Sequence, residues 1–260
     1  MKQEYPILEF DAAREAMIEP HMLHKPHEVP EHCVICFFQE VIESVCGRRG
    51  ELLEDVSLPY HLNSEIGSNP VYVVRKNGQS FTVIHPGVGA PLAAAFLEDV
   101  IALGCKKFIA VGGAGVLNSE LAVGHVVIPT TAVRDEGTSY HYLPPGREVA
   151  ASWRGVEAIQ QTLEHHHLPY VMGKTWTTDA IFRETPAKVA LRRAEGCLTV
   201  EMEAAAFFAV AQFRGVTLAQ ILYGGDSLGG DAWDHRDWIK GQASTREKLF
   251  WLAAEAALRL

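Results

Sequence analysis

Short apolar runs alternate along the chain with longer segments in which apolar positions recur at helical spacing. The runs predict β-strands at residues 33–38, 70–75, 81–85, 107–111, 125–129, 170–175 and 219–223. Helical spacing predicts helices at residues 39–46, 91–103, 151–166, 186–194, 201–213 and 244–258. Because strands that alternate with helices pair mostly in parallel, the pattern predicts an α/β fold. Its central sheet is expected to be mixed but mostly parallel, with helices on both faces.

The alternation begins only after residue 30. The first thirty residues carry too few periodic apolar positions for a core, and they hold instead a set of prolines and histidines: Pro6, Pro20, Pro26, Pro30, His21, His24 and His27. We therefore expect an N-terminal extension at residues 1–30 and a single α/β domain at residues 31–260. The sequence contains no internal repeat and no low-complexity stretch.

Net charge and hydropathy restrict the classes of binding partner and the cellular location expected for the protein. The chain has 32 acidic residues against 23 Lys and Arg, which gives a net charge of −9. So acidic a chain lacks the positive surface of proteins that bind nucleic acids or anionic membranes. The longest apolar run, Ala204–Ala211, is also far shorter than the ~20 residues of a membrane span, and the N-terminus has no apolar signal core. We expect a cytoplasmic protein whose partners are small molecules or other proteins.

The spacing of the cysteines, histidines and aspartates does not predict a metal site. Cys33 and Cys36 make a C-x-x-C pair inside a predicted strand, where alternate residues point to opposite faces, so both are expected to be buried thiols. His165–His167 end a predicted helix and are expected at the surface. The acidic group after residue 230 has no ligand spacing and is expected in a solvated loop: Asp231, Asp234, His235 and Asp237.

Glycines and acids follow the predicted strands. In an open parallel sheet such segments gather at the carboxyl edge, and they are residues 86–89, 112–115, 134–142 and 224–226. Gly112–Gly115 matches neither a nucleotide-phosphate loop nor the dinucleotide fingerprint. Its glycines serve either tight packing or close approach to an anion or a sugar.

Two acidic positions near that edge are candidates for chemistry. Glu201 and Glu203 bracket Met202 just before an apolar helix. Carboxylates favour helix starts through the helix dipole, but a buried one needs a partner, which the hydroxyls of a diol would supply. Asp226 follows a predicted strand on a Gly-Gly turn; it is either a turn-forming residue or an acid tuned by burial to hold a proton near neutrality.

Five segments in this order resemble the nucleoside phosphorylase family, which holds hexameric-type purine nucleoside phosphorylases, uridine phosphorylases and related nucleosidases. The resemblance runs from about Ser80 to the C-terminus, and the segments that carry it are Val123–Pro129, Asp135–Tyr142, Thr175–Glu184, Glu201–Glu203 and Gly225–Asp226.

The resemblance implies roles for particular residues. Met202 would pack under the ribose, and Glu203 of the Glu201-Met202-Glu203 signature would bind its 2′- and 3′-hydroxyls. Asp226 would donate a proton to N7 of a purine base, whereas the Asp135–Tyr142 stretch, which places His141 in the pocket, is similar to uridine phosphorylases. The base site would include Thr178, Asp179, Phe182 and Arg183.

The chain lacks the family's usual residues at the positions that bind phosphate. Phosphorylases of this family use a Gly-Asp-Pro-x-Arg turn after the first strand, an Arg before the central glycine segment and a Ser or Thr within it. Here the first strand runs into Gln39-Glu40, and Ala110 and Gly113 take the other two places. The candidates for a rebuilt phosphate site, besides an arginine of a neighbouring subunit, are Gly112, Gly113, Arg134, Arg183, Arg48 and Arg49.

The implied function is phosphorolysis of a nucleoside to free base and ribose 1-phosphate, with purine favoured over uridine. Phosphate would be the co-substrate, and no cofactor is implied. Two alternatives stay open: hydrolysis of the same bond, with Glu40 as a candidate base, and a nucleoside-binding protein without turnover. The family also implies a homo-oligomer, a dimer or hexamer, in which His21 and His24 are candidates to reach a neighbouring site.

Overall fold

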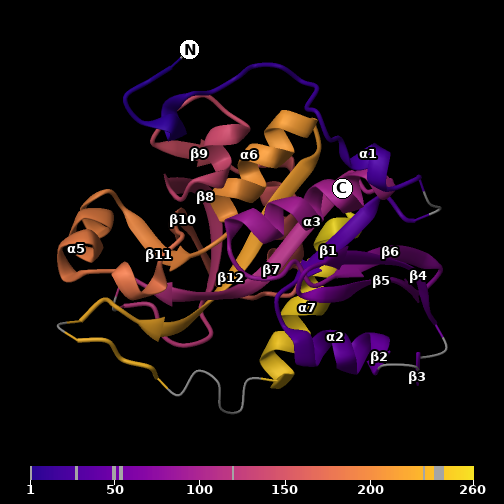
Figure 1. Cartoon of the computed structure of the whole chain (residues 1–260). Helices are drawn as coiled ribbons and strands as arrows, with labels where there is room; N and C mark the ends of the chain where they lie inside the picture. Colours follow the sequence, from indigo (N-terminus) through magenta and orange to yellow (C-terminus); the bar gives the residue numbers. More distant parts are fainter. Residues whose placement is uncertain are drawn as a thin grey trace.

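The computed structural model describes residues 2–26, 29–48, 51–52, 55–118, 120–230, 232–236 and 243–260 (Figure 1). His27, Arg49, Asp231 and Asp237 lie outside the described residues, as does the side chain of Arg48. None of the described helices is both long enough and apolar enough to cross a membrane.

One large mixed sheet organises the domain. Its strands, in order across the sheet, are β11 (Cys197–Glu201), β10 (Tyr170–Thr178), β8 (Val126–Asp135), β12 (Thr217–Ser227), β7 (Lys107–Val116), β1 (His32–Cys36), β6 (Gln79–Ile84), β5 (Gly67–Lys76) and β4 (Val56–Ser64). Strand β9 (Glu148–Ala150) pairs with β8, and β2 (Gly47–Arg48) pairs with β3 (Glu51–Leu52) in a separate ribbon.

The predicted mixed, mostly parallel centre is confirmed. Strands β6, β1, β7 and β12 run parallel to one another, and β8, β10 and β11 form a second parallel group. Antiparallel pairs join β8 to β12 and form the β4–β5–β6 edge. The sequence pattern did not predict β4, β9 or β11, whose polar and apolar residues do not form clear runs.

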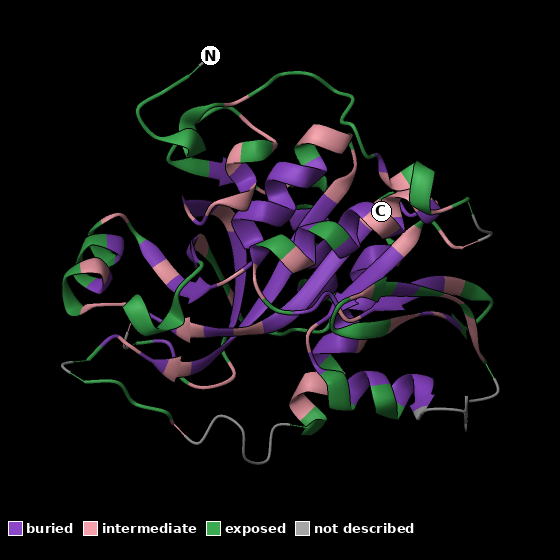
Figure 2. Ribbon diagram, viewed as in Figure 1, coloured by how far each residue is buried: buried purple, intermediate pink, exposed green. Residues whose placement is uncertain are grey.

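Helices cover both faces of this sheet (Figures 1 and 2). Helices α3 (Ala90–Leu103) and α6 (Ala204–Arg214) pack on one face, and α2 (Gln39–Cys46), α4 (Trp153–His165) and α7 (Ala243–Leu258) pack on the other. The shorter elements are α1 (Pro20–Leu23), α5 (Pro186–Ala194), and the 3₁₀ turns η1 (Pro6–Leu8), η2 (Thr138–His141) and η3 (Ile181–Arg183).

Each strand of the centre contributes side chains to both cores. On β1, Val34 and Cys36 enter one core, whereas Cys33 and Ile35 enter the other. The two thiols of the C-x-x-C pair therefore point to opposite faces, as expected from strand alternation. All five cysteines are free and buried.

The N-terminal extension lies along the edge of α3 and α6 (Figure 1). The buried carboxylate of Glu19 pairs with Arg214 at 3.2 Å, and the Arg14 guanidinium lies 4.6 Å from the centre of the Phe213 ring. Both ring nitrogens of His24 are engaged within the chain, with Asp99 at 2.7 Å and Tyr60 at 3.0 Å. The extension is thus tied to its own domain through His24, while His21 is exposed.

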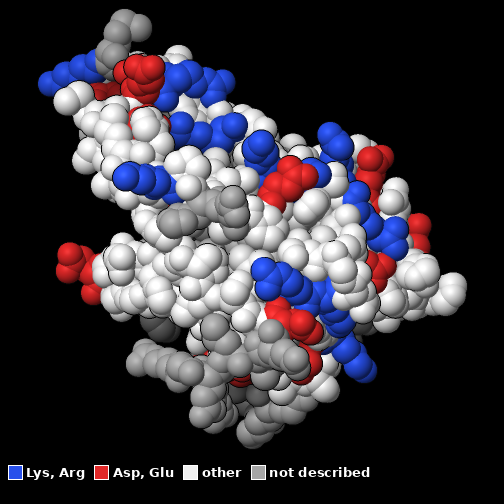
Figure 3. All heavy atoms as spheres, turned by 90° about the vertical axis from the view of Figure 1, so that its right-hand side faces the viewer, with Lys and Arg blue, Asp and Glu red and all other residues white. Residues whose placement is uncertain are grey.

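Basic and acidic side chains lie among one another on the face shown in Figure 3, with wide uncharged areas between them. This mixture fits the negative net charge of the chain, and the exclusion of nucleic-acid partners stays a prediction.

The contact between α4 and β12 leaves no room for a side chain at Gly155. A Cβ there would come 2.7 Å from the Ala219 Cβ and 3.2 Å from the Ala219 nitrogen. We expect Gly155→Ala to lower the free energy of unfolding by roughly 1–3 kcal/mol, because the helix must move away from the strand. Urea denaturation measures it, and the exposed Arg154→Ala on the same helix is the control. A stability equal to that of the control variant would contradict the tight contact.

Candidate active site

Several strands deliver polar side chains to one edge of the sheet. In the parallel pairs, Thr178 at the end of β10 lies opposite Asp135 at the end of β8, and Thr177 lies opposite Glu201 at the end of β11. Strand β12 ends nearby at Ser227, paired with Val116 of β7. The strand-end segments singled out in the sequence therefore meet at this edge, as expected for carboxyl ends of parallel strands.

The Gly112–Gly115 segment is part of strand β7 and not a loop. The sequence pattern ended this strand at residue 111, but it continues to Val116 because Gly112 and Gly113 pair with Leu222 and Tyr223 of β12. A Cβ at Gly112 would lie 2.9 Å from the Phe37 ring, and one at Gly113 would lie 3.2 Å from the Tyr223 ring. Tight packing against aromatic rings is thus a sufficient reason for both glycines.

Glu201 fixes the start of α6. Its Oε2 accepts backbone hydrogen bonds from Glu203 at 2.7 Å and Ala204 at 2.6 Å, and its Oε1 accepts one from the Thr177 hydroxyl at 2.6 Å. The predicted helix began at residue 201, whereas α6 begins at Ala204, because Glu201 belongs to β11 and receives the first free N–H groups of the helix. Burial raises the pKa of Glu201 to about 7.

Glu203 is a buried acid at the start of α6. Its Oε1 accepts a hydrogen bond of 2.6 Å from the backbone N–H of Gly89, in the turn before α3. The backbone of Met202 is a second hydrogen-bonding group near this carboxyl, no described side chain hydrogen-bonds to it, and the side chain of Met202 is partly buried. Burial, and after it the nearby Glu201 carboxyl, raises the pKa of Glu203 to about 8. This carboxyl can accept or donate one further hydrogen bond.

The predicted base site is a loop of mixed exposure. Thr178 is buried and its hydroxyl accepts a hydrogen bond from the Ala180 N–H at 3.2 Å, while Asp179 accepts one from the Gly137 N–H at 2.9 Å. Phe182 is 94% exposed, and Arg183 is exposed as well. The structure thus brings Thr178 and Asp179 to the site and leaves Phe182 and Arg183 at its surface.

A cavity of about 450 Å³ opens beside this loop. Its lining comes from the first turns of α3 and from the segment around η2: Pro91, Ala94, Ala95, Gly137, Thr138, His141, Tyr142 and Asp179. His141 and Asp179, which were predicted from separate segments, therefore share one cavity.

Asp226 is held by a tryptophan. The indole Nε1 of Trp233 donates a hydrogen bond of 2.7 Å to Asp226 Oδ2, and Oδ1 lies 3.4 Å from the place of a Cβ on Gly115. Asp226 thus stands over the glycine strand at the end of β12.

Glu184 is a partly buried acid that the sequence analysis did not single out. It follows η3, is partly buried, and has no hydrogen bond or ion pair from its side chain to another described residue. Burial, and after it the charge of Asp226, raises the pKa of Glu184 to about 7. Only its place at the end of the Thr175–Glu184 segment pointed to it.

Each guanidinium nitrogen of Arg134 donates a hydrogen bond within the scaffold. Its Nε donates to the Ser139 hydroxyl at 2.8 Å, and its terminal nitrogens donate to the carbonyls of Pro144 at 2.8 Å and Leu143 at 3.2 Å. Burial lowers the pKa of Arg134, and the guanidinium lies 4.3 Å from the centre of the Tyr140 ring. These partners account for the side chain without a phosphate ion.

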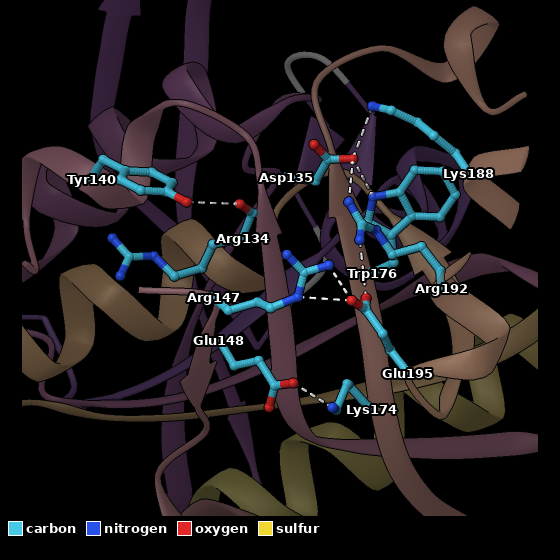
Figure 4. A network of polar contacts seen from close by, with 10 residues as sticks. All are labelled: Arg134, Asp135, Tyr140, Arg147, Glu148, Lys174, Trp176, Lys188, Arg192 and Glu195. Atoms are coloured by element: carbon cyan, nitrogen blue, oxygen red, sulfur yellow. Dashed lines mark hydrogen bonds and ion pairs between the residues drawn. The ribbon is translucent and has the colours of Figure 1, made fainter. Parts of the chain in front are cut away.

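Neighbouring charges form a second structural network (Figure 4). Asp135 accepts hydrogen bonds from Trp176 Nε1 and Lys188 Nζ, each at 3.0 Å, and pairs with Arg192 at 3.0 Å. Arg192 and Arg147 also pair with Glu195. The cations near the ends of β8 and β10 thus hold α5 and β9 to the sheet.

The region where relatives would hold phosphate is aromatic in this chain. The Phe37 ring packs on Gly112, and the His85 ring stands edge-on to it, with 6.3 Å between the ring centres. Glu40, the candidate base for hydrolysis, accepts a 2.5 Å hydrogen bond from Arg246, which also donates to the Tyr223 hydroxyl at 3.0 Å. Glu40 is exposed and ion-paired in this arrangement.

The histidine run forms a small exposed cluster on another part of the molecule. Ligand atoms of His165, His166 and Glu255 lie within 4.8 Å of one another. His166 already pairs with Glu255 at 2.7 Å, and Arg259 pairs with the same carboxylate at 2.7 Å. His165, His166 and His167 are exposed, as the sequence predicted.

The raised pKa values of Glu201 and Glu203 make stability depend on pH. The folded chain holds these protons more tightly than the unfolded chain, so the free energy of unfolding should fall as pH rises from about 5 to about 8.5. We expect Glu203→Gln to lose less stability than the wild type over this range, because its share of the proton uptake is gone. Urea denaturation at the two pH values measures the difference.

The exposed Glu65→Gln variant is the control and should follow the wild type. An equal decline in Glu203→Gln would contradict the shifted pKa of Glu203.

Comparison with known proteins identifies the family of the chain. The model of the phosphorylase superfamily matches residues 31–257, and so extends the predicted resemblance from Ser80 back to β1. Guanosine phosphorylase of Halorubrum lacusprofundi is 25% identical over 225 residues, which cover 83% of this chain and 89% of that protein.

Two solved structures share the fold. Uridine phosphorylase from Vibrio fischeri ES114 superposes with a TM-score of 0.76 at 23% identity, over 95% of this chain and 100% of that chain. AMP nucleosidase from Bacteroides thetaiotaomicron VPI-5482 superposes with a TM-score of 0.69 at 21% identity, over 89% of each chain. The predicted family and the assignment as an enzyme are confirmed: the chain belongs to the phosphorylase superfamily.

Proposed function

We propose that this chain is a nucleoside phosphorylase that cleaves the N-glycosidic bond of a purine nucleoside with phosphate. The products are the free base and ribose 1-phosphate, and phosphate is the only other reactant needed. The observation that carries the proposal is the buried Glu203 carboxyl next to Met202, which is held by backbone N–H groups and by no described side chain. A ribose diol would supply side-on hydrogen bonds to such a carboxyl.

The reaction sets two electrostatic tasks. As the bond from C1′ to the base nitrogen breaks, positive charge develops on the ribose and negative charge on the base. Glu203 would fix the ribose hydroxyls, and its negative charge when ionised would stabilise the cationic sugar. The carboxyl groups of Asp226 and Glu184 would lie at the base end, where a proton must reach the leaving base.

A purine fits this base end better than a pyrimidine. A purine has N7 as an acceptor for the transferred proton, whereas uracil has no corresponding atom. The guanosine phosphorylase relative supports the same preference.

Hydrolysis of the same bond is the second candidate. Ala110 and Gly113 stand where the family places phosphate ligands, Phe37 covers Gly112, and the nitrogens of Arg134 are occupied. Among the candidate arginines whose side chains the structure describes, Arg183 is exposed to solvent. We propose phosphorolysis because the Halorubrum lacusprofundi relative, which overlaps 83% of this chain, is a guanosine phosphorylase.

We also propose that the enzyme works as a homo-oligomer, a dimer or hexamer. Apolar side chains of the extension are exposed, with Met17 at 96% and Leu23 at 67%. Burial of such side chains between subunits is a common reason for their exposure on one chain.

Release of free base from a purine and pyrimidine nucleoside panel, with and without phosphate, tests the proposed function. We expect release from purine nucleosides only when phosphate is present, together with ribose 1-phosphate in equal amount. Equal release without phosphate would establish the hydrolase, and silence across the panel would remove both activities.

Substitution of the ribose carboxylate gives a sharper test. We expect Glu203→Ala to lower kcat/KM on ribonucleosides by about 100-fold or more, because it removes both the hydroxyl contacts and the charge facing the sugar. Initial rates of base release measure the loss, and Glu65→Ala is the surface control. Wild-type rates in Glu203→Ala would refute the ribose assignment.

A further inference from the structure

A second cavity lies on the face of the sheet that carries α2, α4 and α7. Its volume is about 630 Å³, which is within the range of small-molecule pockets. One side of α7 forms its floor, and the β5–β6 hairpin and the loop after α4 form its two walls. Neither Glu203 nor Asp226 lines it, and the sheet separates it from α3 and α6.

The floor of this cavity is apolar and aromatic. The partly buried Trp251 ring stands edge-on to the buried Phe81 ring, with 6.4 Å between the ring centres. Other apolar side chains of the same side of α7 continue the floor: Leu252, Ala254 and Leu258. Because burial of apolar surface is favourable, this floor gains free energy when an apolar group covers it.

The β5–β6 hairpin places a cation over this floor. Asn77 and Gly78 have positive φ values of 52° and 77°, as a tight two-residue hairpin turn requires. Lys76 pairs with Gln79 across this turn, at the end of the hairpin. The Lys76 ammonium group lies 3.3 Å from the centre of the Trp251 ring. The hairpin therefore holds a positive charge directly against an aromatic part of the cavity.

The cavity is positively charged, although the chain has a net charge of −9. The described lining residues include three lysine or arginine side chains and one carboxylate: Lys76, Lys248, Arg259 and Glu255. Glu255 already pairs with His166 and with Arg259, each at 2.7 Å. Among the described residues, no acid forms an ion pair with Lys76 or Lys248. These two ammonium groups therefore remain available to an anion.

We propose that this cavity is a second ligand site, which binds a small organic carboxylate with an aromatic body. The carboxylate pairs with the Lys76 ammonium group, and Lys248 adds to the positive field around it. The aromatic body covers the apolar floor on α7. A free phosphate ion would leave that floor uncovered, and a neutral apolar molecule would leave the ammonium groups without a counter-charge. The site goes beyond the proposed function and does not depend on it.

A matched pair of probes tests the charge and the apolar body separately. Phenylpropionate carries both, whereas phenylpropanol has the same aromatic body without the charge. We expect isothermal titration calorimetry of the full chain to show tighter binding of phenylpropionate. Lys76→Met keeps an apolar stem at an exposed position but removes the charge. It should weaken phenylpropionate binding by roughly 5- to 20-fold and change phenylpropanol binding by no more than about twofold.

Two further variants locate the binding. Lys25→Met, at an exposed position of the N-terminal extension, is the matched control and should leave both affinities unchanged. Glu203→Ala, on the opposite face of the sheet, should also bind phenylpropionate as the wild type does. Loss of binding in Glu203→Ala, with wild-type binding in Lys76→Met, would place the carboxylate in the candidate active site and overturn the proposal.

The Trp251 indole reports on the floor of the cavity directly. Its N–H signal in an NMR spectrum, assigned by its loss in Trp251→Phe, should shift as phenylpropionate is added. An unmoved signal, or no heat of binding up to about 5 mM phenylpropionate, would overturn the proposal. A chain that binds phenylpropionate here but cleaves no nucleoside of the panel would refute the proposed function and leave this second site standing.

Discussion

The buried carboxylate of Glu201 is the interaction on which the site depends. It joins the end of β11 to Thr177 of β10 and to the first two free N–H groups of α6. The Thr177 hydroxyl in turn accepts from the Ala205 N–H at 2.9 Å. Because α6 cannot begin elsewhere, Glu203 comes to lie against the Gly89 turn, and the ribose side of the site is defined.

The carboxyl groups near this edge of the sheet differ in whether they have a cationic partner. Glu203 and Glu184 have no ion pair with a described residue, and burial raises the pKa of each carboxyl. The acids that hold the scaffold, Asp135 and Glu195, are paired with arginines and lysine. Reactive and structural carboxylates are therefore distinguished by their partners and not by their residue type.

Much of the fold was predictable because it rests on local patterns. The apolar runs of β1, β6, β7 and β12 and the amphipathic helices gave the α/β class and the covered sheet. Strand β11 was missed because Cys197–Glu201 is short and ends in a carboxylate, and its pairing with β10 is a non-local contact. The ends of β7 and β12 were placed too early, because glycines in a strand read locally as a turn.

The site was predictable to the extent that it lies in contiguous motifs. Glu201, Met202 and Glu203 stood out as a signature, and Asp226 stood out after its strand. Glu184 gained its importance only from burial and from Asp226, which is distant in the chain. Arg134 shows the opposite case, since only the folded structure reveals that Ser139 and two carbonyls occupy its nitrogens.

The attachment of the N-terminal extension has a mechanical consequence. Gly89 and Glu203 stand at the first turns of α3 and α6, whereas Asp99 and Arg214, toward the other ends of these helices, are gripped by His24 and Glu19. The two helices are therefore held together at their first turns by the hydrogen bond between Gly89 and Glu203. Toward their other ends, each is bonded to the extension. The extension thus supports the helix pair that carries Glu203 and Gly89, at the ends of the helices that lie away from these two residues.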